Sequence, residues 1–412
     1  MQTPDQRIDP VPPRARIVSL DLLRGIAVLG ILIMNIQGFT MIGAAYINPD
    51  AYGDLTGLNK WVWIVSHVLA SEKFMSIFSM LFGAGVVLFA ENALAKGRKA
   101  GSLHYRRMFW LLVFGLLHAY LIWYGDILVA YSLCGMFVYL FRKKRPVQLI
   151  VLSAIFFVIP MLLMTGSGFT TDYWPQESID ANMEQWKPDA KTAAHEVEVM
   201  QGGWLEQMEV RVEKAVFMQT FLFLWNVFWR VTSMMLLGMA LFKLGILAAT
   251  RSRNFYLRMV LLGLIPGILL SSWGVHENFS RGWPMFYSMF FGSQFNYLGS
   301  VFTALGYIGI VMLIARSGCC NGFKIIFSAV GRMAFTNYIL MSLICMFVFY
   351  GNGLGLFGEV SRGEQLLFVA GIWIVLLVIS PLWLKSYRFG PLEWLWRVLT
   401  YWHLQPMKRE HS

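Results

Sequence analysis

Long runs of apolar residues, separated by short polar stretches, dominate this chain. A helix that crosses a bilayer needs about 20 predominantly apolar residues, and helices satisfy their own backbone in lipid. The pattern therefore predicts an all-α fold, a polytopic transmembrane helix bundle of about ten spans. A further apolar stretch, 58–71, is short for a span and is either a half-helix or an eleventh span. The ten runs lie near 17–39, 73–95, 106–124, 127–141, 147–166, 216–247, 255–275, 294–315, 325–350 and 364–385.

One polar stretch, 167–214, is long. It is rich in Asp and Glu, contains aromatic residues and shows no extended core pattern, so we expect a small helical cap over the outer face rather than a separate domain. The rest of the chain divides into a cytosolic N-terminal tail over 1–16, the helix bundle over 17–385 and an amphipathic cytosolic C-terminal tail over 386–412.

The C-terminal tail has the pattern of a membrane-surface helix. Pro391 suits the first turn of such a helix, and Glu393 and Arg397 form an i, i+4 pair on it. We therefore predict an amphipathic helix lying at the membrane interface, with no catalytic part. Its apolar face holds Trp394, Leu395, Val398 and Trp402.

Composition supports the membrane assignment. Hydrophobic residues make up 57% of the chain and charged residues only 14%, where a soluble protein carries about 25% charged residues. The four cysteines suggest no disulfide framework, and no metal-binding motif is present, so we expect no metal site.

The distribution of charge predicts the orientation. Basic residues gather in Lys96–Arg107, Arg142–Arg145, Arg251–Arg258 and the tail after Lys385, whereas the alternate loops lack them. Because cytoplasmic loops carry an excess of Lys and Arg, both termini are expected in the cytosol. The net charge of +11 is spread over these short loops, which favours contact with membrane lipids and argues against nucleic acid as a partner.

The first apolar run carries polar residues that a plain membrane anchor does not need. At about 100° per residue, Arg24 and Asn35 fall within roughly 20° of each other on a helix, and Asp21 lies within roughly 60° of Arg24. Asn35 lies about 16 Å deeper than Arg24 at about 1.5 Å per residue. Polar groups are expensive in hydrocarbon, so this stripe predicts a polar cavity enclosed by the bundle.

A second stretch combines a histidine with a carboxylate. Gly125 is expected at an outer turn, with Asp126 beginning the next helix and His118 lying about 9 Å inside the outer end. His118 is a candidate general base and Asp126 the carboxylate that orients it. Two other interpretations stay open: Asp126 as a helix N-cap and His118 as a hydrogen-bonded packing residue. Asn35 is expected at the same depth, where its alternative role is an interhelical hydrogen bond.

Three further polar residues are candidates for ligand binding. Arg332 and Asn337, in the motif Gly331-Arg-Met-Ala-Phe-Thr-Asn-Tyr338, are expected in the cytosolic half of a span. An arginine there suits a phosphate entering from the cytosol, and the alternative is an ion pair with Asp21. Arg230 lies deep in the run 216–247, where it either lines the same cavity or pairs with an acid.

Taken together, these motifs resemble those of the YeiB family of bacterial inner-membrane proteins. The opening motif is also similar to that of the wider transmembrane acyltransferase superfamily, which includes the lysosomal heparan-glucosaminide N-acetyltransferase. That resemblance implies transfer of an acyl group from cytosolic acyl-CoA to an acceptor across the membrane, with Asn35 matching an active-site asparagine. The heparan enzyme's catalytic histidine has no counterpart in Gly43–Tyr52. The motifs that carry the resemblance are Ser19-Leu-Asp21, Arg24-Gly25, Asn35, His118, Gly125-Asp126, Tyr131, the motif 331–338 and Gly390-Pro-Leu-Glu-Trp-Leu-Trp-Arg397.

Two functional hypotheses follow. In the first, the protein is a transmembrane acyltransferase: His118 is the base, Asp126 orients it and Asn35 holds the thioester oxyanion. Acyl-CoA is then the co-substrate, bound by Arg24, Arg332, Asn337 and Arg230. In the second, the protein is a transporter or flippase of a small polar or lipid-linked metabolite, and the same residues line its path. A structural role beside other envelope proteins is a third reading, and the acceptor and a homodimer stay open.

Overall fold

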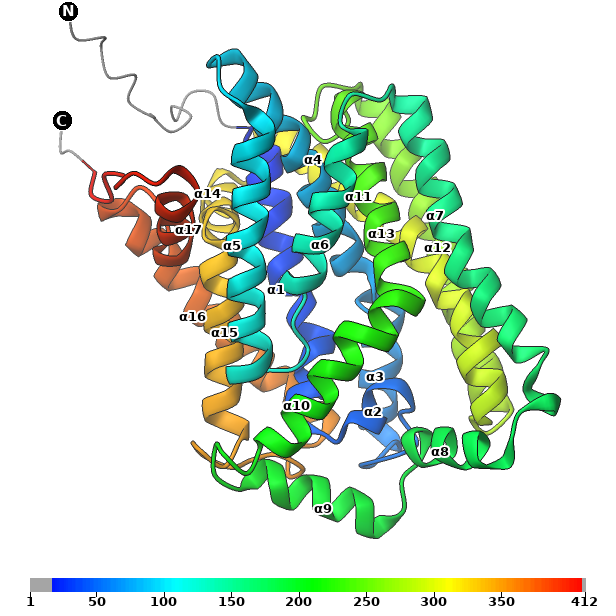
Figure 1. Ribbon diagram of the computed structural model, residues 1–412. Helices are drawn as coiled ribbons and strands as arrows, with labels where there is room; N and C mark the ends of the chain where they lie inside the picture. Colours follow the sequence, from blue (N-terminus) through cyan, green and yellow to red (C-terminus); the bar gives the residue numbers. More distant parts are fainter. Residues whose placement is uncertain (1–16, 410–412) are drawn as a thin grey trace, which may run out of the picture.

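The computed structural model describes residues 17–409 and is almost wholly helical (Figure 1). Within these residues no β-strand forms, and one isolated bridge joins Tyr387 to Lys408. The N-terminal tail expected over 1–16 lies outside the described residues. The helices are α1 (Val18–Thr40), α2 (Gly43–Ile47), α3 (Gly57–Leu69), α4 (Lys73–Ala95), α5 (Ala100–Leu121), α6 (Leu128–Val138), α7 (Pro146–Gly168), α8 (Gln176–Trp186), α9 (Ala190–Gln201), α10 (Met208–Phe217), α11 (Phe228–Lys243), α12 (Arg253–Ser280), α13 (Ser293–Arg316), α14 (Asn321–Arg332), α15 (Ala334–Phe349), α16 (Arg362–Ser386) and α17 (Pro391–Tyr401).

Seven helical stretches in the described part of the chain are long and apolar enough to cross a membrane, or eight if the bent pair α14–α15 counts as one. The protein is thus a multi-pass membrane protein by length and composition, but the expected count of about ten spans is not confirmed. The segments 106–124 and 127–141 form α5 and α6, which lie outside this set. The apolar helix Leu128–Phe141 is short, and α5 carries Arg106 and Arg107 near its start. The seven stretches are Val18–Thr40, Gly57–Ala95, Pro146–Gly168, Met208–Lys243, Arg253–Ser280, Tyr287–Arg316 and Arg362–Ser386.

The short apolar run 58–71 does not add a span of its own. It forms α3, which leads directly into α4, so that Gly57–Ala95 is one candidate span of 39 residues. The break between the two helices lies at Glu72, whose φ of 64° is in the left-handed region. A non-glycine residue in this region is uncommon and marks a local interruption of the helix.

The apolar run 325–350, predicted as one span, is broken. The helices α14 and α15 meet at Met333 with an angle of 79° between them. The first turn of α15 is capped by a side chain from α17. The carboxylate of Glu393 accepts hydrogen bonds from the backbone N–H groups of Phe335 at 2.7 Å and Thr336 at 3.1 Å. A carboxylate at this position satisfies free N–H groups and favours a helix start there.

The polar stretch 167–214 is helical, as expected for a cap. It forms α8, α9 and the beginning of α10, and these helices lie at the end of the bundle opposite α17 (Figure 1). The side chain of Asp189 caps α9 by accepting from the N–H of Thr192 at 2.7 Å, which lowers the pKa of that carboxyl. The helix α10 then continues through a π-helical segment, Met218–Val227, into α11.

The C-terminal helix α17 packs on the bundle. The indole N–H of Trp396 donates to the carbonyl of Arg107 at 2.8 Å, and the guanidinium of Arg107 lies over the Trp396 ring. The helix α17 therefore contributes a wall to the interior of the protein, and most of its residues are half-buried.

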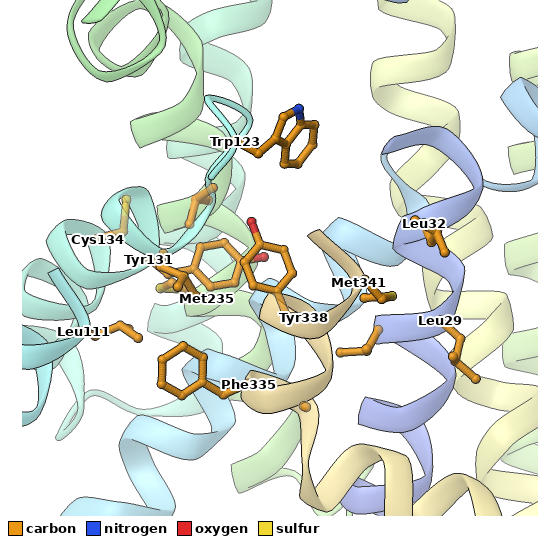
Figure 2. Packing of buried hydrophobic residues seen from close by; sticks show 14 of the residues in the cluster. Leu29, Leu32, Leu111, Trp123, Tyr131, Cys134, Met235, Phe335, Tyr338 and Met341 are labelled. Carbon is orange, nitrogen blue, oxygen red and sulfur yellow. The ribbon is translucent and has the colours of Figure 1, made fainter. Parts of the chain in front are cut away.

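A cluster of buried apolar side chains holds the centre of the bundle together (Figure 2). It draws on α1, α5, α6, α11 and α15, so segments far apart in the sequence meet there. Since lipid is as apolar as these side chains, close packing rather than exclusion of water holds the helices together. Members shown in Figure 2 are Leu29, Leu32, Leu111, Trp123, Tyr131, Cys134, Met235, Phe335, Tyr338 and Met341.

Candidate functional site

A cavity of about 370 Å³, here called the central cavity, lies within the bundle. Its walls come from α1, α4, α5, α6, α14, α15 and α17. This volume is within the range of roughly 300–1,000 Å³ that is usual for small-molecule sites. The polar stripe of the first helix had predicted an enclosed cavity, and Arg24 of that stripe lines it.

One end of the central cavity is strongly basic. The basic side chains come from the first turns of α1, the loop between α4 and α5, the N-terminal half of α5, the end of α14, and α17. Among the lining residues they face one carboxylate, that of Glu393. A concave site lined by one sign of charge raises the local concentration of oppositely charged ligands. We call this end the basic mouth, formed by Arg24, Lys96, Arg98, Arg107, Arg332 and Arg397.

Two glycines explain why Arg24 and Arg332 meet at the basic mouth. A Cβ added to Gly25 would lie 2.0 Å from the carbonyl oxygen of Phe327, and one added to Gly331 would lie 1.9 Å from that of Asp21. The backbones of α1 and α14 are therefore in close contact at the positions next to the two arginines. Small residues allow this approach of membrane helices.

The rest of the central cavity is mostly apolar. Lining residues recur on one face of α4 from Phe78 to Lys96, a length of about 27 Å at about 1.5 Å per residue. Opposite them lie Met108 and Leu111 of α5 and Phe335 of α15. At the inner end the wall is formed by Ile127, Leu128, Tyr131 and Tyr338.

His118 and Asp126 form a buried pair just behind this inner wall. The distance between His118 Nδ1 and Asp126 Oδ1 is 2.8 Å, and each side chain is 1% exposed. The second oxygen, Oδ2, accepts from the N–H of Val129 at 2.7 Å. Asp126 therefore contacts the histidine with one oxygen and, just before the N-cap residue Ile127, the first turn of α6 with the other. A Cβ on Gly115 would lie 2.6 Å from Val129 N, so this glycine allows α5 and α6 to bring the pair together.

The pairing determines which nitrogen of His118 is available. An ionised Asp126 only accepts hydrogen bonds, so Nδ1 carries the proton in the neutral ring and Nε2 holds the free lone pair. Within residues 17–409, Nε2 is buried and has no hydrogen-bond partner. A buried polar atom without a partner is costly, and such atoms call for a functional explanation.

Tyr338 connects His118 to the central cavity. Its ring centroid lies 5.0 Å from that of His118, and the same side chain lines the cavity. Its hydroxyl accepts from the N–H of Ile127 at 3.3 Å, next to Asp126. Tyr338 and Tyr131 lie in the same part of the core (Figure 2). The histidine itself is not part of the lining, so Tyr338 covers it.

The other predicted site residues lie outside the cavity wall. Asn35 is half-buried on α1 and is not a lining residue. Asn337 is buried and donates to Val330 O at 3.1 Å and to Ser380 Oγ at 2.9 Å, which ties α15 to α14 and α16. Of the four predicted ligand-binding residues, Arg24 and Arg332 line the cavity, whereas Asn337 and Arg230 do not.

Arg230 has the ion-pair environment that was its alternative interpretation. Its Nη2 lies 3.0 Å from the carboxylate of Glu72 and donates to Ser300 Oγ at 2.7 Å. Lys73, next in the chain, is fully buried and contacts Ser271 and Asn296. These residues form a second polar cluster between α4, α11, α12 and α13, separate from the central cavity. Removal of Glu72 would leave the charge of Arg230 buried without an opposite charge, which is strongly destabilising.

Sequence reasoning missed the role of α17. Glu393 was assigned only to a surface pair, whereas it caps α15 and lines the basic mouth. Burial raises the pKa of its carboxyl above the ordinary value. A carboxylate between Leu392 and Trp394, on a helix with few polar residues, was the signal that could have indicated an inward-facing position. For metals, no group of three His, Cys, Asp or Glu residues in the described part of the chain could hold an ion.

Comparisons with known proteins give similarity over nearly the whole chain. Residues 241–403 match the family model described as "Protein of unknown function (DUF418)". The chain is 32% identical over 388 residues to "Uncharacterized protein YeiB" of Escherichia coli (strain K12), which covers 93% of this chain and 96% of that protein. It is 33% identical over 427 residues, 98% of each chain, to "Uncharacterized protein YxaH" of Bacillus subtilis (strain 168). The matched family segment includes Arg332, Tyr338 and Glu393, but not His118.

Proposed function

The chain belongs to the YeiB-like family, and we propose that it is an acyltransferase that moves an acyl group from acyl-CoA to an acceptor across the membrane. One observation carries this proposal. The central cavity joins a mouth of six basic side chains to Tyr338, which packs on the His118–Asp126 pair. Such a cavity offers both a site for a polyphosphate and a route from it to a general base.

In the proposed complex the phosphates of acyl-CoA bind at the basic mouth. Arg24, Arg107 and Arg332 supply planar guanidinium groups that suit bidentate contact with phosphate. The pantetheine arm then extends along α4 and carries the thioester to the inner wall. Asn35, Asn337 and Arg230 receive no role in this mechanism.

At the inner wall His118 acts as the general base. Its Nε2 takes the proton of an acceptor hydroxyl or amine while the acceptor oxygen or nitrogen attacks the thioester carbon. The carbon–sulfur bond breaks, and the leaving thiolate takes the proton back from His118. Asp126 holds the ring by its Nδ1–H and stabilises the imidazolium that forms in between. Because Tyr338 covers His118, its side chain has to turn aside before transfer.

For topology, we infer ten crossings of a bacterial inner membrane with both termini in the cytosol. The pair α5 and α6, joined by the close contact at Gly115, would supply the two crossings beyond those that length and apolarity support. The basic loops all fall on one side in this arrangement, as expected of cytosolic loops. A helix bundle can hold short or polar helices such as α5 and α6, because the neighbouring helices shield them from lipid.

Binding of CoA to the purified protein in nanodiscs tests the proposal. Calorimetry should show saturable binding that Arg332→Ala weakens by at least tenfold, because it removes a phosphate ligand from the basic mouth. Arg258→Ala is the matched control, since Arg258 is exposed on α12 and outside the cavity. Equal losses in both variants, or no binding to the wild-type protein, would reject the CoA site.

The second candidate function, a transporter or flippase, is favoured by the Arg230–Glu72 pair and the buried Lys73. Intramembrane charges of this kind often mark a substrate or proton path. This reading predicts flux of a solute in proteoliposomes without consumption of acyl-CoA. The acyltransferase reading predicts free CoA as a product, which a thiol reagent detects.

A further inference from the structure

Two glycines on α4 occupy contrasting environments. A Cβ added to Gly83 would lie 2.0 Å from the carbonyl oxygen of Met235, so this glycine is required by the contact of α4 with α11. A Cβ added to Gly85, two residues later, would have no atom within 4 Å. Gly85 lines the central cavity, so the empty space beside it is the cavity itself.

No backbone requirement explains Gly85. It lies in the interior of α4, outside the set of glycines with positive φ, and its neighbours make no close approach. Glycine weakens a helix interior relative to alanine because it costs more conformational entropy. Gly85 is thus unfavourable for the helix and unnecessary for packing. We explain it by the space that its missing side chain leaves open in the central cavity.

The position of Gly85 makes that space a passage. It lies 11 residues from Lys96 of the basic mouth and seven from Phe78, or about 16 Å and 10 Å along the helix. The neighbouring walls are Phe82 and Phe89 of α4 and Leu111 of α5. A ligand that is bound at the mouth and reaches Tyr338 has to pass this apolar section.

We propose that Gly85 determines the width of the central cavity and thereby the class of ligand that enters it. This ligand is a phosphate-anchored molecule whose single, unbranched arm passes α4 to reach the inner wall. This inference rests on the proposed function, in which the arm is pantetheine. It assigns the basic mouth to the headgroup and the space beside Gly85 to the arm, so the two parts of the ligand depend on different residues.

Two probes separate headgroup binding from passage of the arm. Adenosine 3′,5′-bisphosphate carries the adenosine and two of the three phosphates of the CoA headgroup without an arm, whereas CoA carries the whole headgroup and the arm. Gly85→Leu and Gly85→Phe narrow the cavity in two steps, and the Cβ of either side chain meets no atom within 4 Å. We expect a graded loss of CoA affinity, more than tenfold for Gly85→Phe, while the affinity for the bisphosphate changes less than twofold.

Gly371→Phe is the matched control. Gly371 lies exposed on α16, where an added Cβ also meets nothing within 4 Å, so the same bulk is added outside the cavity. This variant should bind both probes as the wild type does, and thermal unfolding should show that all variants are folded.

Unchanged CoA affinity in Gly85→Phe would overturn the inference while leaving the CoA site in place. Equal loss of both probes would also overturn it, because the effect would then not be confined to the arm. If the wild-type protein bound neither probe, the proposed function would fail and the inference with it.

Discussion

At the scale of single residues, the pairing of His118 with Asp126 decides what the inner wall can do. Replacing His118 by Ala should lower the rate of acyl transfer by about 10²–10⁴-fold, the usual contribution of a general base. The measurement is release of free CoA under single-turnover conditions. His67→Ala is a suitable control, because His67 stacks on Trp63 away from the cavity lining. A transfer rate near that of the wild type in His118→Ala would remove His118 from the mechanism.

Asp126→Asn tests the orienting role separately. The amide keeps the shape and an oxygen for the N–H of Val129, but it no longer offers a charge to His118. We expect a lower transfer rate with CoA affinity close to that of the wild type, because the imidazolium that forms during transfer loses its opposite charge. A purely structural role would instead lower the melting temperature and weaken CoA binding together with the transfer rate.

The buried carboxyl of Glu393 should make the stability of the folded protein depend on pH. Burial raises the pKa of its carboxyl, so the folded protein takes up this proton at a higher pH than the unfolded chain does. Protonation therefore favours the folded state, and the contribution of Glu393 to stability increases as pH falls from neutral towards 4.5, its ordinary pKa. Glu393→Gln has no such titration. As pH falls, the melting temperature of the wild type should rise relative to that of Glu393→Gln. A difference between the two melting temperatures that does not change with pH would contradict this prediction.

At the scale of elements, the contact between α1 and α14 aligns the arginines of the basic mouth. Gly331→Leu would force α14 away from Asp21, and overpacking of this kind costs about 1–3 kcal/mol. We expect a lower melting temperature together with weaker CoA binding. Gly322→Leu, in the same helix but with nothing within 4 Å of an added Cβ, should change neither. Similar behaviour of the two variants would mean that the close contact is unimportant.

At the scale of the whole molecule, native cysteines report the proposed topology. Cys319 and Cys320 are exposed between α13 and α14, whereas Cys134 and Cys345 are buried. With an impermeant maleimide, we expect labelling in inside-out vesicles and none in intact spheroplasts. A Cys319→Ser, Cys320→Ser protein carrying Glu177→Cys in α8 should show the reverse. Labelling of the native pair from outside would reject the cytosolic assignment of this end.

The sequence by itself determined that the chain is a helical, multi-pass membrane protein of the YeiB-like family. It also singled out Arg24, Arg332, His118 and Asp126, because polar groups in apolar runs are rare and conspicuous. Hydropathy reports the average surroundings of a segment, so it could not show that α3 joins α4, that α14 breaks from α15, or that α5 and α6 fall outside the apolar set.

Only the tertiary structure decided which polar residues share a cavity. Helical spacing gives the face on which a residue lies, but not the neighbour that this face meets, and the neighbour depends on contacts such as Gly25 with α14. For that reason Arg230 belongs to an ion pair with Glu72, Asn337 to a contact between helices and Glu393 to the cavity wall. Packing between segments distant in the chain, which no local pattern encodes, separates the residues that line the cavity from those that hold the bundle together.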